Sequence, residues 1–290
     1  MKFNLYTDIH AFYRSTFDIL MRHEAQNMII LGNVVIGNEG KDKYDWRDPA
    51  NWMMATVTDE TGIRLTALMT PPHGLTLYAT DNLIDDTAIT YLIDGISDTD
   101  FALPGLMTEK NLAERFIQIY SQVYGKKYII ETEMRIFELL QVNPDIPKAG
   151  RLRPATDYDL YFLPYWIESF YADAFAHKDN AIEIPVDIEK YRHRIPKLYV
   201  WENEAETPVS IANVGREMQT VCGIGSVYTP PYFRCKGYAS ACVASLSQLQ
   251  LDKGFTRCVL YTDLANPTSN SIYKKIGYMP IADSLEVKFE

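Results

Sequence analysis

The stretch 220–253 constrains the fold of this chain more than any other part of the sequence. Its apolar residues 221–228 predict a strand, the adjacent Pro230 and Pro231 end that strand, and a short loop leads to a helix that opens near Gly237. Apolar residues at helical spacing predict that one face of this helix packs on a sheet: Ala239, Val243, Leu246 and Leu249.

The first turn of the expected helix is suited to an anion. Arg234 and Lys236 place two cations where the first amides of a helix have no partner within the helix. Gly237 permits a left-handed backbone or a close approach by a ligand, and the small side chain of Ala239 leaves neighbouring amides uncovered. Because these amides and the helix dipole favour negative charge, the pattern predicts a phosphate site.

Two common phosphate motifs do not explain this site. The sequence has no G-x-x-x-x-G-K-[ST] loop, and its G-x-G, Gly223 to Gly225, falls inside the expected strand and does not open a helix. These observations exclude a P-loop nucleotide hydrolase and a dinucleotide-binding fold.

A second informative segment runs from Leu260 to Tyr278. Asn266 suits a helix N-cap, Pro267 suits the first helical position, and Gly277 suits the end of the helix. These capping roles do not account for Asn270 and Tyr273, a polar pair at positions i and i+3. The same helix otherwise offers apolar residues to the core.

Together, the two segments resemble the GCN5-related N-acetyltransferase (GNAT) superfamily. The first, RCKGYA at 234–239, is similar to its R/Q-x-x-G-x-G/A pyrophosphate loop. The second matches a closing N-x-x-[SA]-x-x-x-Y-x-x-x-G-[FY] pattern at Asn266, Ser269, Tyr273, Gly277 and Tyr278. The resemblance covers roughly residues 151–290.

The resemblance implies a site for acetyl-CoA as co-substrate. Main-chain groups of Ser226, Val227 and Tyr228 would pair with the pantetheine arm, and the amides of Arg234, Cys235, Lys236, Gly237, Tyr238 and Ala239 would hold the pyrophosphate. Asn266 and Asn270 would lie beside the cofactor arm, and Tyr273 would donate a hydrogen bond or a proton at the thioester sulfur. Cys235 departs from the commoner residues of that loop, and we interpret it as a spectator.

The order of expected elements predicts two similar α/β (α+β) units in tandem, and the resemblance implies that each is an acyl-CoA N-acyltransferase-like unit with a mixed, mainly antiparallel sheet flanked by helices. The proline-rich segment 143–150 predicts a boundary, which gives a degenerate GNAT-like domain at 1–146 and a catalytic GNAT domain at 147–290. The segment 80–86, TDNLIDD, stands where the second half has Arg234 and Lys236. Because its carboxylates would repel a pyrophosphate, we expect the first half not to bind coenzyme A.

Several expected helices and strands support this comparison. In the first half we expect helices over 8–24, 85–96 and 109–124, a hairpin from 52–58 and 63–70, and strands at 75–79, 101–103 and 127–142. In the second half we expect helices over 157–176, 186–194 and 267–276, a hairpin from 197–202 and 208–214, and strands at 257–262 and 282–289.

Composition restricts the partners and the compartment. The formal net charge of −10 argues against nucleic acid and mildly favours a cationic small molecule. No apolar run reaches membrane length and the N-terminus has no signal-peptide core, so we expect a cytoplasmic protein without a membrane contact. The spacing of Cys222, Cys235, Cys242 and Cys258 indicates neither a zinc site nor a disulfide framework, and we expect reduced thiols.

The expected activity is direct transfer of an acetyl group from acetyl-CoA to a primary amine of a small molecule in a ternary complex, which makes the protein an acyltransferase for groups other than aminoacyl groups. The aromatic segment 157–194 would cover the acceptor site. A protein amine as acceptor and a non-catalytic acyl-CoA-binding module are the alternatives. The candidates for the general base are open: Asp263, Glu217, Glu168, Asp173, His177 or a water chain.

Overall fold

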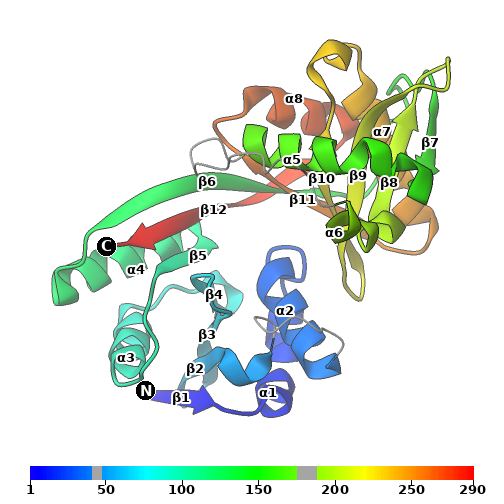
Figure 1. The fold of residues 1–290 in the computed structure, drawn as a ribbon. Coiled ribbons are helices and arrows are strands. Elements are labelled where there is room, and N and C mark those ends of the chain that lie inside the picture. The colour runs from blue at the N-terminus through cyan, green and yellow to red at the C-terminus, as the bar shows by residue number, and fades with distance from the viewer. Residues whose placement is uncertain (41–47, 175–187) are drawn as a thin grey trace. The chain divides into compact units, whose positions relative to one another are not determined.

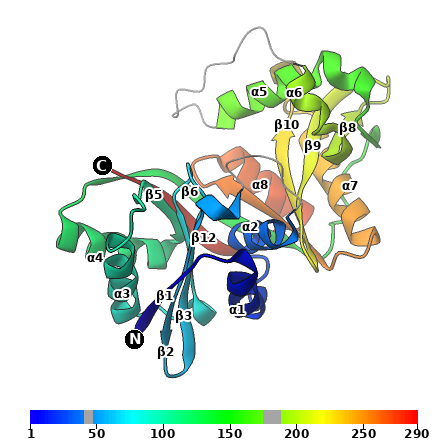
Figure 2. The same ribbon diagram turned by 60° about the horizontal axis from the view of Figure 1, so that its bottom comes forward.

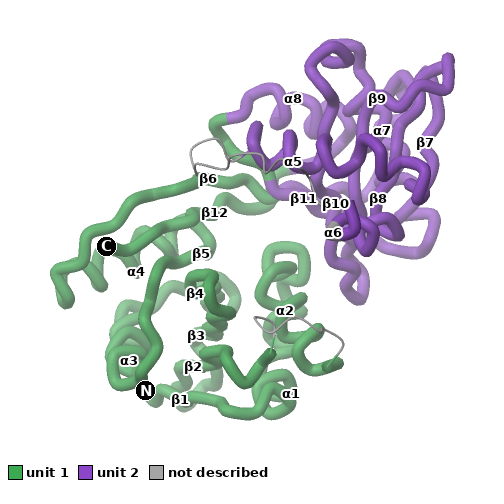
Figure 3. The backbone as a smooth tube through the Cα atoms, viewed as in Figure 1, with its two compact units in different colours: residues 1–136, 262–265, 280–290 green, residues 137–261, 266–279 purple. Residues whose placement is uncertain are grey.

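The structure is a computed structural model that describes residues 1–40, 48–174 and 188–290 (Figure 1). The chain forms two compact units, which Figure 3 distinguishes by colour. Unit 1 comprises residues 1–136, 262–265 and 280–290, and unit 2 comprises residues 137–261 and 266–279. The last strand of the chain therefore belongs mainly to the first unit.

The two units do not coincide with the ranges 1–146 and 147–290 expected from the sequence. The chain leaves unit 1 after Ile136, inside strand β6 (Tyr128–Leu139), and the proline-rich segment 143–150 lies within unit 2. The backbone N–H of Asn143 donates to the carbonyl of Ile276 at 2.8 Å, and its side chain donates to the carbonyl of Lys275 at 3.1 Å. Proline and polar residues indicate an exposed loop, whether or not that loop joins two compact units.

Unit 1 contains a mixed sheet in which most neighbouring strands are antiparallel. Its strand order is β1, β2, β3, β4, β5, β12, β6. The strands not yet given are β1 (Lys2–Tyr6), β2 (Met53–Asp59), β3 (Gly62–Met69), β4 (Leu75–Ala79), β5 (Gly105–Glu109) and β12 (Met279–Phe289). Strand β12 pairs with β5 from Ser284 opposite Glu109 to Lys288 opposite Gly105.

The described helices of unit 1 are α1 (Ile9–Met21), α2 (Met28–Glu39), α3 (Asp86–Ser97) and α4 (Lys110–Tyr124). Helices α1, α3 and α4 confirm the amphipathic segments that the sequence predicts. The apolar faces of α3 and α4 pack with the strands around Leu92 and Phe116. Strand β1 and helix α2 had not been predicted, and the strand expected at 101–103 is wrong because the strand lies at 105–109. Helix α2, MIILGNVVIGNE, is apolar around most of its circumference and therefore lacks the amphipathic period.

Unit 2 contains the strand order β11, β10, β9, β8, β7. These strands are β7 (Arg151–Pro154), β8 (Leu198–Glu202), β9 (Pro208–Glu217), β10 (Val221–Tyr228) and β11 (Arg257–Asp263), whose last residues, 262 and 263, belong to unit 1. Strands β7 to β10 are antiparallel to their neighbours, whereas β10 and β11 are parallel. The helices are α5 (Leu163–Ala174), α6 (Glu189–Arg192), α7 (Tyr238–Asp252) and α8 (Pro267–Ile276). The sequence pattern does not predict strand β7.

The two faces of the unit 2 sheet pack against different helices. On one face Cys222, Ile224 and Leu260 join an apolar cluster with α7 and α8. Figure 2 shows α7 running alongside β8 to β10. On the other face Val200 and Ile211 join a cluster with α5 and its neighbouring turns. Helices α7 and α5 therefore lie on opposite faces of the unit 2 sheet.

The predicted fold class, mixed and mainly antiparallel sheets flanked by helices, is confirmed. Within the described ranges, no helix combines the length and the apolar character that crossing a membrane requires. All four cysteines are free, and burial raises the pKa of each of the buried thiols Cys222, Cys242 and Cys258 to about 12. These three thiols therefore stay protonated at neutral pH, as expected for core residues.

Candidate active site

Strands β10 and β11 pair for only a short distance. Their register joins Val221 to Arg257, Cys222 to Cys258 and Gly223 to Val259, and among the described residues no later pair continues this ladder. Strand β10 nevertheless runs on to Tyr228. The two parallel strands therefore separate beyond Gly223, which leaves main-chain groups of β10 without a partner on the β11 side.

An irregularity in β10 lies in this separated part. The pairing of β10 with β9 shifts between Gly225 and Tyr228, and Ser226 has a φ of 47°, which is unusual for a residue with a side chain. A bulge of this kind interrupts the ladder and turns backbone N–H and C=O groups away from the neighbouring strand. Ser226 and Val227, two of the residues expected to contact the pantetheine arm, lie in this interruption.

The loop after β10 is fixed by Arg234. Its Nε donates to the carbonyl of Thr229 at 2.9 Å, its Nη2 lies 2.5 Å from Oδ2 of Asp173, and its Cζ lies 5.7 Å from the ring centroid of Tyr228. The hydroxyl of Thr229 is 2.9 Å from that of Ser210 on β9. The guanidinium therefore connects both ends of the loop and does not extend freely into solvent.

The N-terminus of α7 offers a row of uncommitted amides. The first intrahelical bond runs from the N–H of Ala241 to the carbonyl of Gly237, and no side chain caps the helix. In the part of the chain that the structure describes, no acceptor lies within hydrogen-bond geometry of the amides of residues 235–240. Gly237 has a φ of 81°, and the place where its Cβ would lie is empty to 4 Å. Backbone donors, a helix dipole and open space suit a diphosphate.

Helix α3 of unit 1 differs at the corresponding place. There the carboxylate Oδ1 of Asp85 accepts hydrogen bonds from the N–H groups of Thr87 at 2.9 Å and Ala88 at 3.2 Å. Strands β4 and β5, like β10 and β11, are parallel over a short ladder, Leu75 to Leu106 and Thr76 to Met107. The chain's own carboxylate therefore takes the amides that an anion would need in unit 1.

Tyr273 lies on α8 with its ring in the apolar cluster of unit 2. It is 8% exposed, and its ring centroid is 6.3 Å from that of Phe137 and 6.0 Å from that of Tyr278. Burial raises the pKa of the Tyr273 phenol to about 12. Burial is the sole cause of this shift and no hydrogen bond from a described residue contributes to it, so the phenol is protonated at neutral pH.

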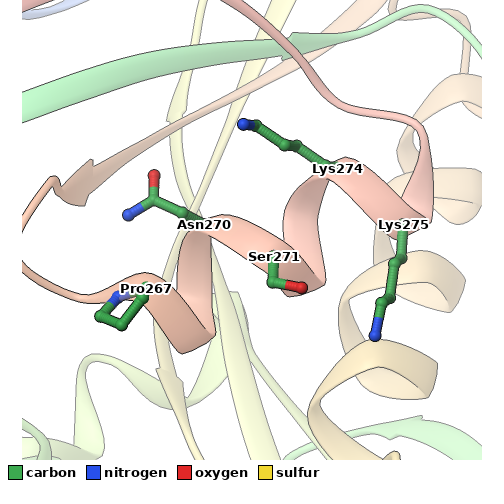
Figure 4. A pocket seen from close by; sticks show the side chains of 5 residues that line it. All are labelled: Pro267, Asn270, Ser271, Lys274 and Lys275. Atoms are coloured by element: carbon green, nitrogen blue, oxygen red, sulfur yellow. The ribbon is translucent and has the colours of Figure 1, made fainter.

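The two asparagines of α8 have structural roles in the free protein. Asn266 Oδ1 accepts from the N–H of Ser269 at 3.0 Å, which confirms the N-cap that the sequence predicts. The side chain of Asn270 donates to the carbonyl of Asn266 at 2.7 Å. Asn270 also lines a surface hollow with Pro267, Ser271, Lys274 and Lys275. Figure 4 shows that the two lysines leave the last turn in different directions, so they do not converge on one ligand.

The candidates for a general base are dispersed. Glu168 accepts a short hydrogen bond from the hydroxyl of Tyr191, Asp173 is paired with Arg234, and Glu217 lies 3.5 Å from Lys197 Nζ. Asp263 accepts from the N–H of Ala265 at 2.7 Å. His177 lies outside the described residues.

The α5 face carries the aromatic residues expected over the acceptor site. Trp166, Phe170 and Tyr171 are half-buried against the cluster of that face, whereas Tyr158, Tyr161 and Tyr165 are exposed. The ring of Trp166 lies 6.4 Å from that of Tyr228. These contacts place α5 against strand β10, next to its bulge. The sequence does not predict the pairing of Asp173 with Arg234, because 61 residues separate them and nothing local links them.

Comparison with known proteins points to one fold. Residues 209–287 match the protein-family model described as FR47-like protein. Solved structures with similar folds include a GNAT-family acetyltransferase from Colwellia psychrerythraea (TM-score 0.54, 12% identity, covering 100% of this chain and 99% of that chain). A GCN5-related N-acetyltransferase from Sphaerobacter thermophilus has a TM-score of 0.61 at 13% identity and covers 99% of this chain and 95% of that one. A Drosophila protein has a TM-score of 0.63 at 11% identity, and the match covers 99% of this chain and 98% of that one. A comparison with curated proteins found no match.

Proposed function

We propose that this chain, which has the fold of the GCN5-related N-acetyltransferases, is an acetyl-CoA-dependent N-acetyltransferase for a primary amine of a small molecule. The observation that carries the proposal is the combination, within unit 2, of the separated strands β10 and β11 and the uncommitted amides at the start of α7. The FR47-like match at 209–287 includes both features.

Acetyl-CoA would be held by the main chain. The amides of residues 235–240 and the cations Arg234 and Lys236 suit its diphosphate, and the free backbone groups around Ser226 suit the amides of its pantetheine arm. Bound there, acetyl-CoA would supply the acetyl group as a thioester. The corresponding place in unit 1 is occupied by Asp85, so we propose that unit 1 does not bind coenzyme A.

The side chains of unit 2 provide different environments on the two sides of this site. The α7 and α8 side is apolar and presents the protonated phenol of Tyr273, which can donate a hydrogen bond to a departing thiolate. The acceptor amine would approach from the α5 side, where Trp166 and Tyr171 are only partly buried, whereas the larger cluster with α7 and α8 fills the other face. The protein's main contribution is then positioning and stabilisation of the leaving group.

An amine screen tests the proposal. The full-length protein is mixed with acetyl-CoA and a panel of small primary amines, lysine peptides and an amine-free blank, and thiol release is measured together with the mass of the acetylated product. We expect thiol release above the blank and a product heavier by one acetyl group with at least one small amine. Transfer to peptides alone would indicate a protein substrate, and acetyl-CoA binding without any transfer would indicate a regulatory module.

A further inference from the structure

Asn213 places a polar carboxamide on the central strand β9, where the neighbouring residues are mostly buried and apolar. Its carboxamide oxygen Oδ1 is buried from solvent and makes no hydrogen bond to a described residue. Leaving a buried carbonyl oxygen unpaired is unfavourable, because the group loses its hydrogen bonds to water without replacement. Such groups are uncommon in folded proteins, and a ligand that donates a hydrogen bond is one explanation.

The carboxamide lies over Gly225, beside the bulge of β10. Asn213 and Gly225 are direct register partners, so their side-chain positions share one face of the sheet. A Cβ placed on Gly225 would lie 3.0 Å from Asn213 Oδ1, its one close neighbour. The absence of a side chain at Gly225 therefore leaves room for the carboxamide next to Ser226, where the backbone irregularity begins.

The face on which Asn213 lies is the α5 face. Asn213 pairs with Leu198, and Ile211 two residues earlier points the same way; both of these residues belong to the apolar cluster with α5. On β10, Gly223 and Gly225 alternate with Cys222 and Ile224, which point toward α7. The α5 face of β10 therefore has no side chain at two successive positions, and Asn213 supplies the polar atom beside them.

We infer that Asn213 Oδ1 is the subsite that receives an N–H group of the acceptor amine. This inference rests on the proposed function and deepens it, because it names the residue that selects and orients the acceptor. Oδ1 has no accessible surface in the free protein, so an amine donates one N–H to it once the side chains on the α5 face above Gly223 and Gly225 move aside, and the lone pair of the amine then faces the thioester near the bulge. The interaction requires a donor with at least one N–H, and an unhindered primary amine satisfies it best.

Two substitutions at this position and one matched control test the inference. Asn213→Leu replaces the carboxamide by an apolar side chain of similar size. Asn213→Ser also removes the carbonyl, with a smaller side chain, and serves as the test if leucine does not fit. Thr66→Val is the control, because Thr66 Oγ1 in unit 1 is likewise buried and without a partner among the described residues. For each protein, kcat/KM for the best amine, the Kd of acetyl-CoA by calorimetry and the Tm are measured.

We expect Asn213→Leu and Asn213→Ser to lower kcat/KM for the amine by about 10-fold or more, with the Kd of acetyl-CoA within about twofold of the wild type. Asn213→Leu should raise the Tm by about 2 °C, since it removes an unpaired buried group, and Thr66→Val should raise the Tm without changing the kinetics. Unchanged amine kinetics, or an equal loss of acetyl-CoA affinity, would overturn the inference.

The proposed function and the subsite can fail separately. If the wild-type protein does not bind acetyl-CoA, the proposed function is wrong and the subsite falls with it. If the protein binds acetyl-CoA but acetylates none of the primary amines, the cofactor site stands and the amine subsite is overturned.

Discussion

Nη2 of Arg234 lies 2.5 Å from Oδ2 of Asp173, and this ion pair ties the loop before α7 to the end of α5. The side chains are 46% and 55% exposed, so the pair is screened by solvent and contributes little to stability. Its main effect is electrostatic. Asp173 offsets a positive charge beside the uncommitted amides of α7, and Arg234 remains anchored by Thr229 even without it.

Replacing Asp173 by asparagine should therefore strengthen the binding of coenzyme A. Asp173→Asn leaves one more net positive charge near the diphosphate, and we expect the Kd to fall by about two- to fivefold at low salt. The gain should disappear at about 1 M salt, where charges more than a few ångströms apart are screened. Glu189→Gln, which breaks the exposed pair between Glu189 and Arg192, is the control and should not change the Kd. Weaker binding by Asp173→Asn would show that Asp173 positions Arg234.

A carboxylate at position 237 should weaken cofactor binding. Gly237→Asp places a negative charge at the start of α7, where we propose that the diphosphate binds, and we expect the Kd of coenzyme A to rise by about 10-fold or more. Gly254→Asp is the matched control, because Gly254 also has a positive φ (107°), has no neighbour within 4 Å of its missing Cβ, and follows the other end of the same helix. Gly254→Asp should lose at least as much stability as Gly237→Asp by thermal melting, because a negative charge is favourable at the start of a helix and unfavourable at its end. Equal loss of binding in both would contradict the phosphate site.

The sequence predicts the elements around the proposed cofactor site well, because the signals for these elements are local. Strand β10 and helix α8 have the expected bounds, since a proline pair ends the first and an asparagine cap and a glycine delimit the second. Gly237 at the start of α7 likewise has the left-handed backbone that its position suggested. In each case neighbouring residues determine the conformation, so a short window of sequence is sufficient.

The remaining features depend on contacts between distant residues. Strand β12 is predicted as an element, yet its pairing with β5 follows from no pattern in either strand. The sequence does not single out Asn213, because an asparagine within an apolar run says nothing about whether its oxygen finds a partner in the folded chain. Helix α2 was not predicted because burial on most sides removes its period. These properties arise only when the sheet is assembled.

The buried carboxylate of Asp159 should make unit 2 sensitive to acid. Burial acts to raise its pKa, but hydrogen bonds from Arg153 at 2.7 Å and from the N–H of Thr156 at 2.7 Å outweigh burial and lower the pKa below its usual value. Because the folded pKa is lower than the unfolded one, of about 3.9, the ionised carboxylate stabilises the protein above that pH. This stabilisation is lost as the pH falls through the folded pKa.

Asp159→Asn should consequently lower the free energy of unfolding by about 3 kcal/mol at neutral pH, since it leaves Arg153 without one of its charged partners. The difference from the wild type should shrink below about pH 4. Urea unfolding between about pH 3 and pH 7 measures both effects. Asp157→Asn, at an exposed position paired with Arg192, is the control and should change stability by less than about 0.5 kcal/mol. A difference that does not vary with pH would argue against linkage to this carboxylate.

Tyr273 and Tyr278 are matched residues with different expected roles. Both phenols are buried in the same cluster, with ring centroids 6.0 Å apart, but only the hydroxyl of Tyr278 has a partner, Ser247 Oγ at 2.8 Å. The pKa of Tyr273, about 12, exceeds that of an ordinary thiol, about 8.5, so complete proton transfer from this phenol to a thiolate is uphill. In the proposed reaction Tyr273 would therefore act by donating a hydrogen bond to the leaving group and not by net protonation.

Tyr273→Phe should separate binding from chemistry. It removes no hydrogen bond within the protein, so we expect an unchanged Tm and an unchanged Kd for acetyl-CoA, whereas single-turnover acetylation should slow by about 10²-fold or more, the scale of losing one donor to a developing negative charge. Tyr278→Phe leaves Ser247 unpaired and should lower stability by about 1 kcal/mol without changing the single-turnover rate. Since the phenol of Tyr273 stays protonated far above neutral pH, the wild-type rate should not fall between about pH 7 and pH 10 through its ionisation. A Tyr273→Phe rate within about twofold of the wild type would remove this hydroxyl from the mechanism and leave Tyr273 as a core residue.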